Sequence, residues 1–164
     1  MSAARAVFYH LTRLGLDETL AMILARAHKA GWKVMVRGTD RVALEALDAR
    51  LWALCEGEAF LPHGLEGGPQ DAAQPILLGM GALAAGTKGL VLLDGAVTDA
   101  QEARGLERVW VLFDGNDPAR RDGARGLWSG LTTGGMAAQY WSDETGVWVM
   151  KVERPATPSD GAEN

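Results

Sequence analysis

Strand-like and helix-like periods alternate along the first half of the chain, and this alternation constrains the fold more than any other feature. Residues 6–11 (AVFYHL) are apolar, aromatic and β-branched, which is typical of a strand. Residues 17–31 carry apolar side chains at helical spacing and end in a glycine, which predicts a helix. Residues 32–37 repeat the strand pattern, and residues 40–52 repeat the helix pattern. This order predicts an α/β fold with a mostly parallel sheet.

Residues that favour helix capping support these boundaries. Asp17 is placed to cap the first helix, and either Thr39 or Asp40 can cap the second. The second helix carries one apolar stripe, formed by Leu44, Leu47, Leu51 and Leu54.

The second half of the chain continues with short apolar segments separated by turns. We expect an exposed loop at residues 66–74, strands at 75–78, 90–93 and 109–113, and a short helix within 98–106. Two closing strands are expected at residues 139–142 and 147–152.

The last helix has the clearest start in the sequence. Asp117 can cap it, and Pro118 fits the first helical position, where its missing N–H is not needed. Glycines inside this helix weaken it by roughly 1 kcal/mol each relative to alanine, so we expect tertiary packing to hold it. These glycines are Gly123, Gly126 and Gly130.

The size and charge of the chain exclude several classes of protein. Its 164 residues fit one domain, which we place at residues 1–152, followed by a polar tail at 153–164 that we expect to be disordered. A single cysteine fits a reducing cytoplasm, and no apolar run indicates a signal peptide or a membrane span. A net charge of −5 disfavours non-specific binding to nucleic acid, so we expect little or no direct DNA binding.

Residues suited to catalysis are sparse. Residues 81–88 (GALAAGTK) have the glycine spacing of a Walker A motif, but Thr87 precedes Lys88, which reverses the order that the motif requires. None of the three histidines is at metal-ligand spacing with another histidine or with the cysteine. We therefore expect no active site, metal or cofactor. The alternative is a nucleotide-binding or phosphoryl-transfer enzyme on a similar fold, in which ATP stabilises the protein through Lys88.

One face of the last helix has the chemistry of a peptide-binding site. Arg121, Arg125 and Trp128 recur at i, i+4 and i+7, so they share one stripe. Guanidinium groups bind carboxylates through two hydrogen bonds, and an indole ring offers an apolar wall. The pattern favours an acidic peptide that ends in a hydrophobic residue. A solvated helix face with one half-buried tryptophan would show the same pattern.

An apolar connector follows the second helix, where a polar loop would be expected. It comprises Trp52, Phe60, Pro62 and His63. Either its two large rings hold the loop against the core, or they form an exposed patch for protein binding. His63 could orient the loop through a hydrogen bond to the backbone.

Several segments, in this order, resemble the chi subunit of bacterial DNA polymerase III. They are the FYHL strand, the helix before GWKVMV, LDARLW followed by FLPHGL, QPILL, VWVLFDGNDP, ARGLW and the YW…GVWVMK ending. The resemblance implies a Rossmann-like, three-layer α/β sandwich with helices on both faces of the sheet. It also implies an accessory subunit of the clamp-loader assembly, without catalysis of its own.

The resemblance further implies two partner surfaces. The apolar connector matches the signature that faces the psi subunit in the family. Arg125 and Trp128 match the arginine and the aromatic residue that grip the acidic C-terminal tail of single-stranded DNA-binding protein, and Arg121 lies beside them. Many family members place a lysine directly after this aromatic residue, whereas this chain has Ser129.

Overall fold

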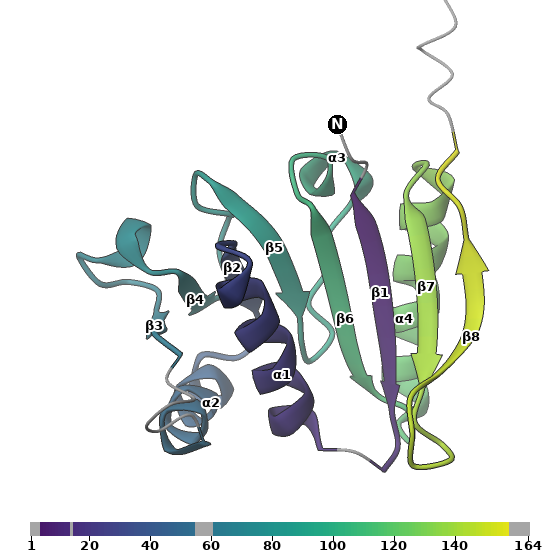
Figure 1. Ribbon diagram of the computed structural model, residues 1–164, viewed down its shortest axis with the longest axis horizontal. Coiled ribbons are helices and arrows are strands. Elements are labelled where there is room, and N and C mark those ends of the chain that lie inside the picture. Colours follow the sequence, from purple (N-terminus) through teal and green to yellow (C-terminus); the bar gives the residue numbers. More distant parts are fainter. Residues whose placement is uncertain (1–3, 14, 55–60, 158–164) are drawn as a thin grey trace, which may run out of the picture.

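One sheet of eight strands organises the protein (Figure 1). The structure is a computed structural model and describes residues 4–13, 15–54 and 61–157. The sheet order is β3-β4-β2-β5-β6-β1-β7-β8, and all neighbours are parallel except β7 and β8. The strands are β1 Arg5–Leu11, β2 Lys33–Arg37, β3 Gly64–Leu65, β4 Ile76–Gly79, β5 Thr87–Leu92, β6 Arg108–Asp114, β7 Ala137–Ser142 and β8 Val149–Arg154.

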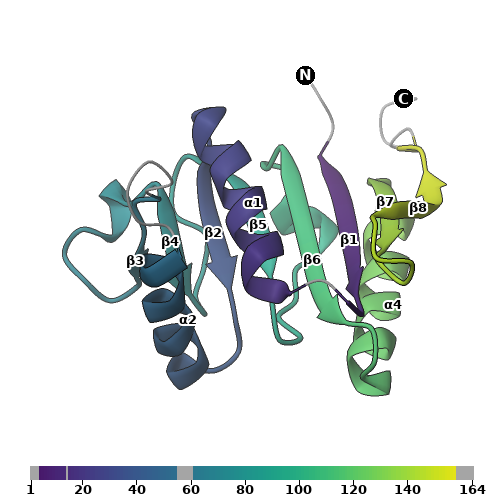
Figure 2. The same ribbon diagram turned by 60° about the horizontal axis from the view of Figure 1, so that its bottom comes forward.

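Helices cover both faces of this sheet, which makes three layers (Figures 1 and 2). They are α1 Leu16–Lys29, α2 Arg41–Leu54, α3 Ala100–Ala103 and α4 Pro118–Thr133, and a short 3₁₀ helix spans Asp71–Ala73. Buried side chains of α1 and α2 share one hydrophobic core, and those of α3 and α4 share a second core. The predicted three-layer α/β fold with a mostly parallel sheet is therefore confirmed.

Strand β1 lies between β6 and β7 and runs parallel to both. Its last residues pair with the ends of these neighbours: Leu11 is in register with Asp114, and His10 with Ser142. The loop after β1, the loop before α4 and the turn after β7 therefore meet at the carboxyl ends of these three strands. Side chains that are far apart in the sequence come together there.

The described helix boundaries differ from the predicted ones at α1. This helix begins at Leu16 with Gly15 at its N-cap, so Asp17 lies in the first turn and does not cap. The Asp17 carboxylate instead accepts a hydrogen bond from Arg50 of α2. At α2 the prediction is confirmed, because the Asp40 carboxylate accepts the Val42 N–H.

The end of the chain is more ordered than expected. Strand β8 continues through Arg154, so the first two residues of the predicted tail belong to the sheet. The Thr157 N–H also donates to the Gly135 carbonyl. Backbone pairing with β7 therefore includes Glu153 and Arg154, which the prediction assigned to the tail. Residues 158–164 lie outside the described part of the chain.

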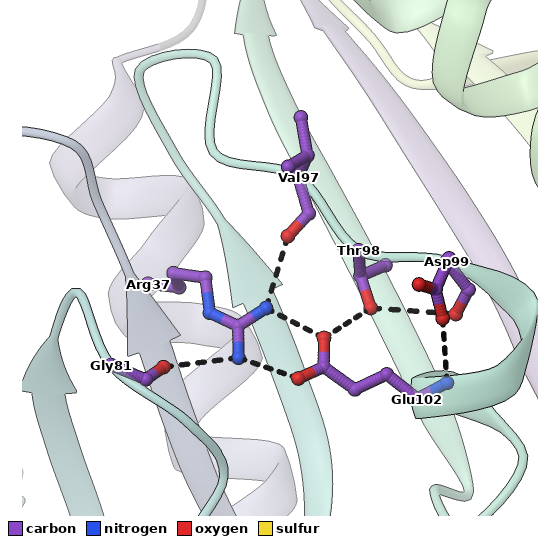
Figure 3. A network of polar contacts seen from close by, with 6 residues as sticks. All are labelled: Arg37, Gly81, Val97, Thr98, Asp99 and Glu102. Carbon is purple, nitrogen blue, oxygen red and sulfur yellow. Dashed lines mark hydrogen bonds and ion pairs between the residues drawn. The ribbon is translucent and has the colours of Figure 1, made fainter.

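A buried arginine joins three segments near the carboxyl end of β2 (Figure 3). Arg37 is 8% exposed and donates to both carboxylate oxygens of Glu102 in α3, at 2.7 and 3.0 Å. It also donates to the carbonyls of Gly81 and Val97. Thr98 completes the arrangement by donating its hydroxyl to Glu102. These bonds hold the β4–β5 loop and the start of α3 against β2.

Candidate functional site

Helix α4 begins as predicted. The Asp117 carboxylate accepts the N–H groups of Ala119 and Arg120, and Pro118 occupies the first helical position. The cap and the proline fix the residue at which the helix begins. The buried residues of the helix, Ala124 and Leu131, pack into the core on this face of the sheet.

Trp128 lies on the side of α4 that meets β1 and β7. Its half-buried ring packs edge-on against Phe8, with the centroids 5.3 Å apart, and against Tyr140, at 6.3 Å. Edge-to-face contacts of this kind stabilise aromatic pairs beyond the area that they bury. Trp128 is therefore held in place by rings from two strands.

Tyr140 is the residue around which this surface is built, and the sequence analysis did not single it out. Its hydroxyl lies 2.6 Å from Nδ1 of His10. Burial raises the pKa of the Tyr140 hydroxyl, and the nearby charges of Arg125 and Arg121 act against this rise while Glu144 adds to it. The structure therefore brings Arg121, Arg125 and Trp128 together around Tyr140.

The two arginines of the stripe differ in environment. Arg121 is half-buried, whereas the Arg125 side chain is 78% exposed. Arg125 lies 3.7 Å from the Asp122 carboxylate, in a fully solvated i, i+3 pair that contributes little to stability. Its guanidinium remains accessible to a ligand in solution.

A pocket of about 450 Å³ adjoins Arg121. Its lining comes from the end of β1 and the loop after it, the loop before α4, the first turn of α4 and the turn after β7. The lining residues are His10, Thr12, Arg13, Gly115, Asn116, Arg121 and Glu144. The pocket places a second arginine, Arg13, beside the α4 stripe. We call this region the α4 surface; it consists of Arg121, Arg125 and Trp128, the Tyr140 ring and the residues that line the pocket.

A buried carboxylate fixes one wall of the α4 surface. Asp143 is fully buried and accepts the Thr12 N–H, the Thr12 hydroxyl and the Arg13 N–H, at 2.6, 2.6 and 3.0 Å.

Sequence reasoning missed His10, Arg13 and Tyr140 because β1 and β7 pair across about 130 residues, and no local pattern indicates such a pairing.

The apolar connector contributes to a separate surface, in which Trp52 belongs to α2 and His63 follows that helix. The Trp52 ring stacks on the His63 ring, with centroids 4.2 Å apart, and Trp52 is 39% exposed. His63 is buried, and its Nδ1 lies 2.7 Å from the Leu61 carbonyl, which confirms that it orients the loop through the backbone. Pro62 is half-buried beside it. Phe60 lies outside the described residues.

The features that suggested nucleotide chemistry have structural roles instead. Residues 80–86 connect β4 directly to β5, so Lys88 lies inside a strand, whereas a phosphate loop needs a strand before it and a helix after it. Within the described ranges, no group of three or more His, Cys, Asp or Glu side chains could hold a metal ion.

No helix in the described part of the chain combines the length and the apolar character that crossing a membrane requires.

Comparison with protein families identifies a family to which most of the chain is similar. Residues 3–139 match the family described as DNA polymerase III chi subunit, HolC. The matched range includes α4 and the apolar connector and ends inside β7, so the strand β8 follows it. A search of curated proteins found no match. Because the family match covers most of the sequence, the chain belongs to the DNA polymerase III chi subunit family.

Proposed function

We propose that this chain is a non-catalytic accessory subunit of the bacterial DNA polymerase III holoenzyme. In this role it links the clamp-loader assembly to single-stranded DNA-binding protein in the cytoplasm. Membership of the chi family supports the replication role. The observation that carries the link is the α4 surface, where Arg121, Arg125 and Trp128 gather around Tyr140.

The α4 surface suits the acidic C-terminal tail of single-stranded DNA-binding protein. Arg125 is exposed and Arg121 lines the adjoining pocket, so two guanidinium groups can reach neighbouring carboxylates. Charge-assisted hydrogen bonds from arginine are about twice as strong as neutral ones. The rings of Trp128 and Tyr140 supply the apolar wall for a hydrophobic end residue.

Ser129 replaces the lysine that many family members carry, and Arg121 compensates for it in this proposal. Ser129 is exposed on α4. Arg121 lies two turns earlier and acts on the same Tyr140 hydroxyl as Arg125. The cationic character of the surface is therefore kept although one family position is neutral.

The apolar connector is the proposed contact for a psi-like subunit of the clamp loader. Trp52 is held by its stacking on buried His63, so its ring is presented without much loss of side-chain freedom on binding. Pro62, which precedes His63 in the sequence, is half-buried, and Phe60 completes the set in the sequence.

A pull-down with intact and truncated single-stranded DNA-binding protein tests the proposed link. We expect the immobilised chain to retain the intact protein and to lose it when the last residues of the acidic tail are removed. Equal retention of the truncated protein would contradict the proposal. High salt should weaken retention, because exposed charge pairs are screened.

A further inference from the structure

The pocket of about 450 Å³ in the α4 surface is cationic, and the function proposed above uses only Arg121 of its lining. Two guanidinium groups, those of Arg13 and Arg121, line it together with the His10 imidazole and one carboxylate, Glu144. We call this cavity the Arg13 pocket. Two guanidinium groups against one carboxylate favour an anionic ligand.

The cationic groups of the Arg13 pocket are available to a ligand. Within the described part of the chain, the side chains of Arg13 and Arg121 form no hydrogen bond and no ion pair, and the Nε–H of Arg121 is a buried donor without an acceptor. Arg37, by contrast, binds both oxygens of the Glu102 carboxylate. Donors that are unpaired in the free protein can be given to the oxygens of a partner.

The backbone of the loop after β1 holds Arg13 at this position. The buried Asp143 carboxylate accepts the Arg13 N–H at 3.0 Å, and it accepts both the N–H and the hydroxyl of Thr12 at 2.6 Å. The Arg13 side chain is exposed, so a ligand can reach it from solution. A loop that is already fixed loses less conformational freedom when a ligand binds.

The place of the Arg13 pocket along α4 gives a bound peptide a direction. Arg121 lies near the start of α4, and Trp128 lies about two turns later. The helix rise puts about 10 Å along the axis between these two residues. An extended peptide covers that distance in about three residues.

We propose that the Arg13 pocket binds the acidic side chain about three positions before the hydrophobic end residue of the single-stranded DNA-binding protein tail, and that Arg13 is a specificity-determining residue. This inference rests on the function proposed above, which places the end residue at Trp128 and Tyr140. The tail then runs in the same direction as α4. Arg13 and Arg121 share one upstream carboxylate, and Arg125 remains for the groups nearer the end of the tail.

Glu144 limits the charge that the Arg13 pocket accepts. It is exposed in the turn after β7, where its N–H donates to the Ser142 hydroxyl and its side chain lines the pocket. Its negative charge repels an anion, so the pocket suits one carboxylate better than a more highly charged group. Glu144→Gln should therefore tighten tail binding about twofold to threefold. Glu45→Gln, at an exposed glutamate of α2, is the matched control.

Fluorescence anisotropy with a labelled tail peptide tests the role of Arg13. Arg13→Gln should raise the Kd about threefold to tenfold, and Arg13→Lys, which keeps the charge, should retain most of the affinity. Arg5→Gln, at an exposed arginine near the opposite end of β1, is the matched control and should bind like wild type.

A double-mutant cycle between protein and peptide tests the direction. Each aspartate or glutamate of the peptide is replaced in turn by its amide, and the end residue is replaced by alanine. Arg13→Gln should have little further effect on the peptide that lacks the carboxylate about three positions before the end. It should weaken the peptide with the alanine end as much as it weakens the intact peptide, because the two contacts are separate.

The outcomes separate this inference from the proposed function. Equal affinities of wild type and Arg13→Gln, while Arg125→Ala still loses binding, would overturn the role of Arg13 and leave the proposed function standing. Coupling of Arg13 to the end residue would overturn the direction, and a Glu144→Gln variant that binds no more tightly than wild type would overturn the charge limit. Absence of tail binding by wild type would overturn both proposals. Circular dichroism verifies the native fold of each variant.

Discussion

Glu102 makes a pH-dependent contribution to stability through Arg37. Hydrogen bonding from Arg37 lowers the pKa of the Glu102 carboxyl from its ordinary value of 4.5. Because the folded pKa is depressed, this stabilisation is present above the ordinary value and is lost as the pH falls through the lowered folded value. We expect Glu102→Gln to reduce the free energy of unfolding by about 1–3 kcal/mol at neutral pH.

Urea denaturation of wild type and Glu102→Gln at neutral and acid pH measures this contribution. The difference between the two should shrink in acid, and a constant difference would contradict the assignment. Glu45→Gln is the control, because Glu45 forms an exposed pair with Arg41 and should contribute less than about 0.5 kcal/mol.

Gly115 is required by the position of His10. A Cβ atom at residue 115 would collide with the His10 ring. Gly115→Ala should therefore displace His10, break its contact with the Tyr140 hydroxyl and weaken binding of the acidic tail several-fold. Fluorescence anisotropy with a labelled tail peptide measures the affinity. Gly105→Ala, where a Cβ would meet no atom, is the matched control, and equal affinities of the two variants would contradict this role.

At the scale of elements, three glycines inside α4 lower the stability of this helix. A Cβ atom at Gly123, Gly126 or Gly130 would meet no heavy atom within 4 Å, so these glycines do not serve close packing within the chain. Replacing each with alanine should raise the free energy of unfolding by about 0.5–1 kcal/mol. Thermal or urea unfolding of the single variants tests this, and destabilisation at all three would show that the glycines have a packing role.

A closely packed glycine, Gly89, serves as the control for these substitutions. Gly89 in β5 faces Trp110, whose ring would lie 2.6 Å from a Cβ atom. Gly89→Ala should therefore destabilise the protein where the α4 substitutions stabilise it.

Local signals explain why the elements were largely predictable. Asp117 and Pro118 mark the start of α4, and the leucine stripe marks α2, because caps and periodicity act over a few residues. The two-residue β3 carries no such signal. The extent of β8 was underestimated, because pairing with β7 overrides the polar character of Glu153 and Arg154.

The candidate site was predictable only in part, because some of its residues are brought together by strand pairing rather than by local sequence. Arg121, Arg125 and Trp128 share one helix, so their spacing shows that they lie together. Tyr140, His10 and Arg13 join them through the β1–β7 pairing, which depends on the whole chain.

At the scale of the molecule, the two proposed partner surfaces lie on opposite faces of the sheet. Helix α2 carries Trp52 on one face, and α4 packs on the other (Figure 2). Sites this far apart with no shared side chains should act independently, within about 0.5 kcal/mol. Trp52→Ala should therefore weaken binding of a psi-like subunit and leave tail affinity unchanged. Surface plasmon resonance with each partner checks this, and a parallel loss of both affinities would show coupling.

Isothermal titration of a peptide from the acidic tail of single-stranded DNA-binding protein tests the central proposal most directly. Wild type should bind, and Arg125→Ala should lose on the order of 2 kcal/mol or more of binding free energy. Arg26→Ala, at an exposed arginine of α1 on the opposite face, should bind like wild type. Unchanged affinity of Arg125→Ala would contradict the proposal that α4 holds the tail.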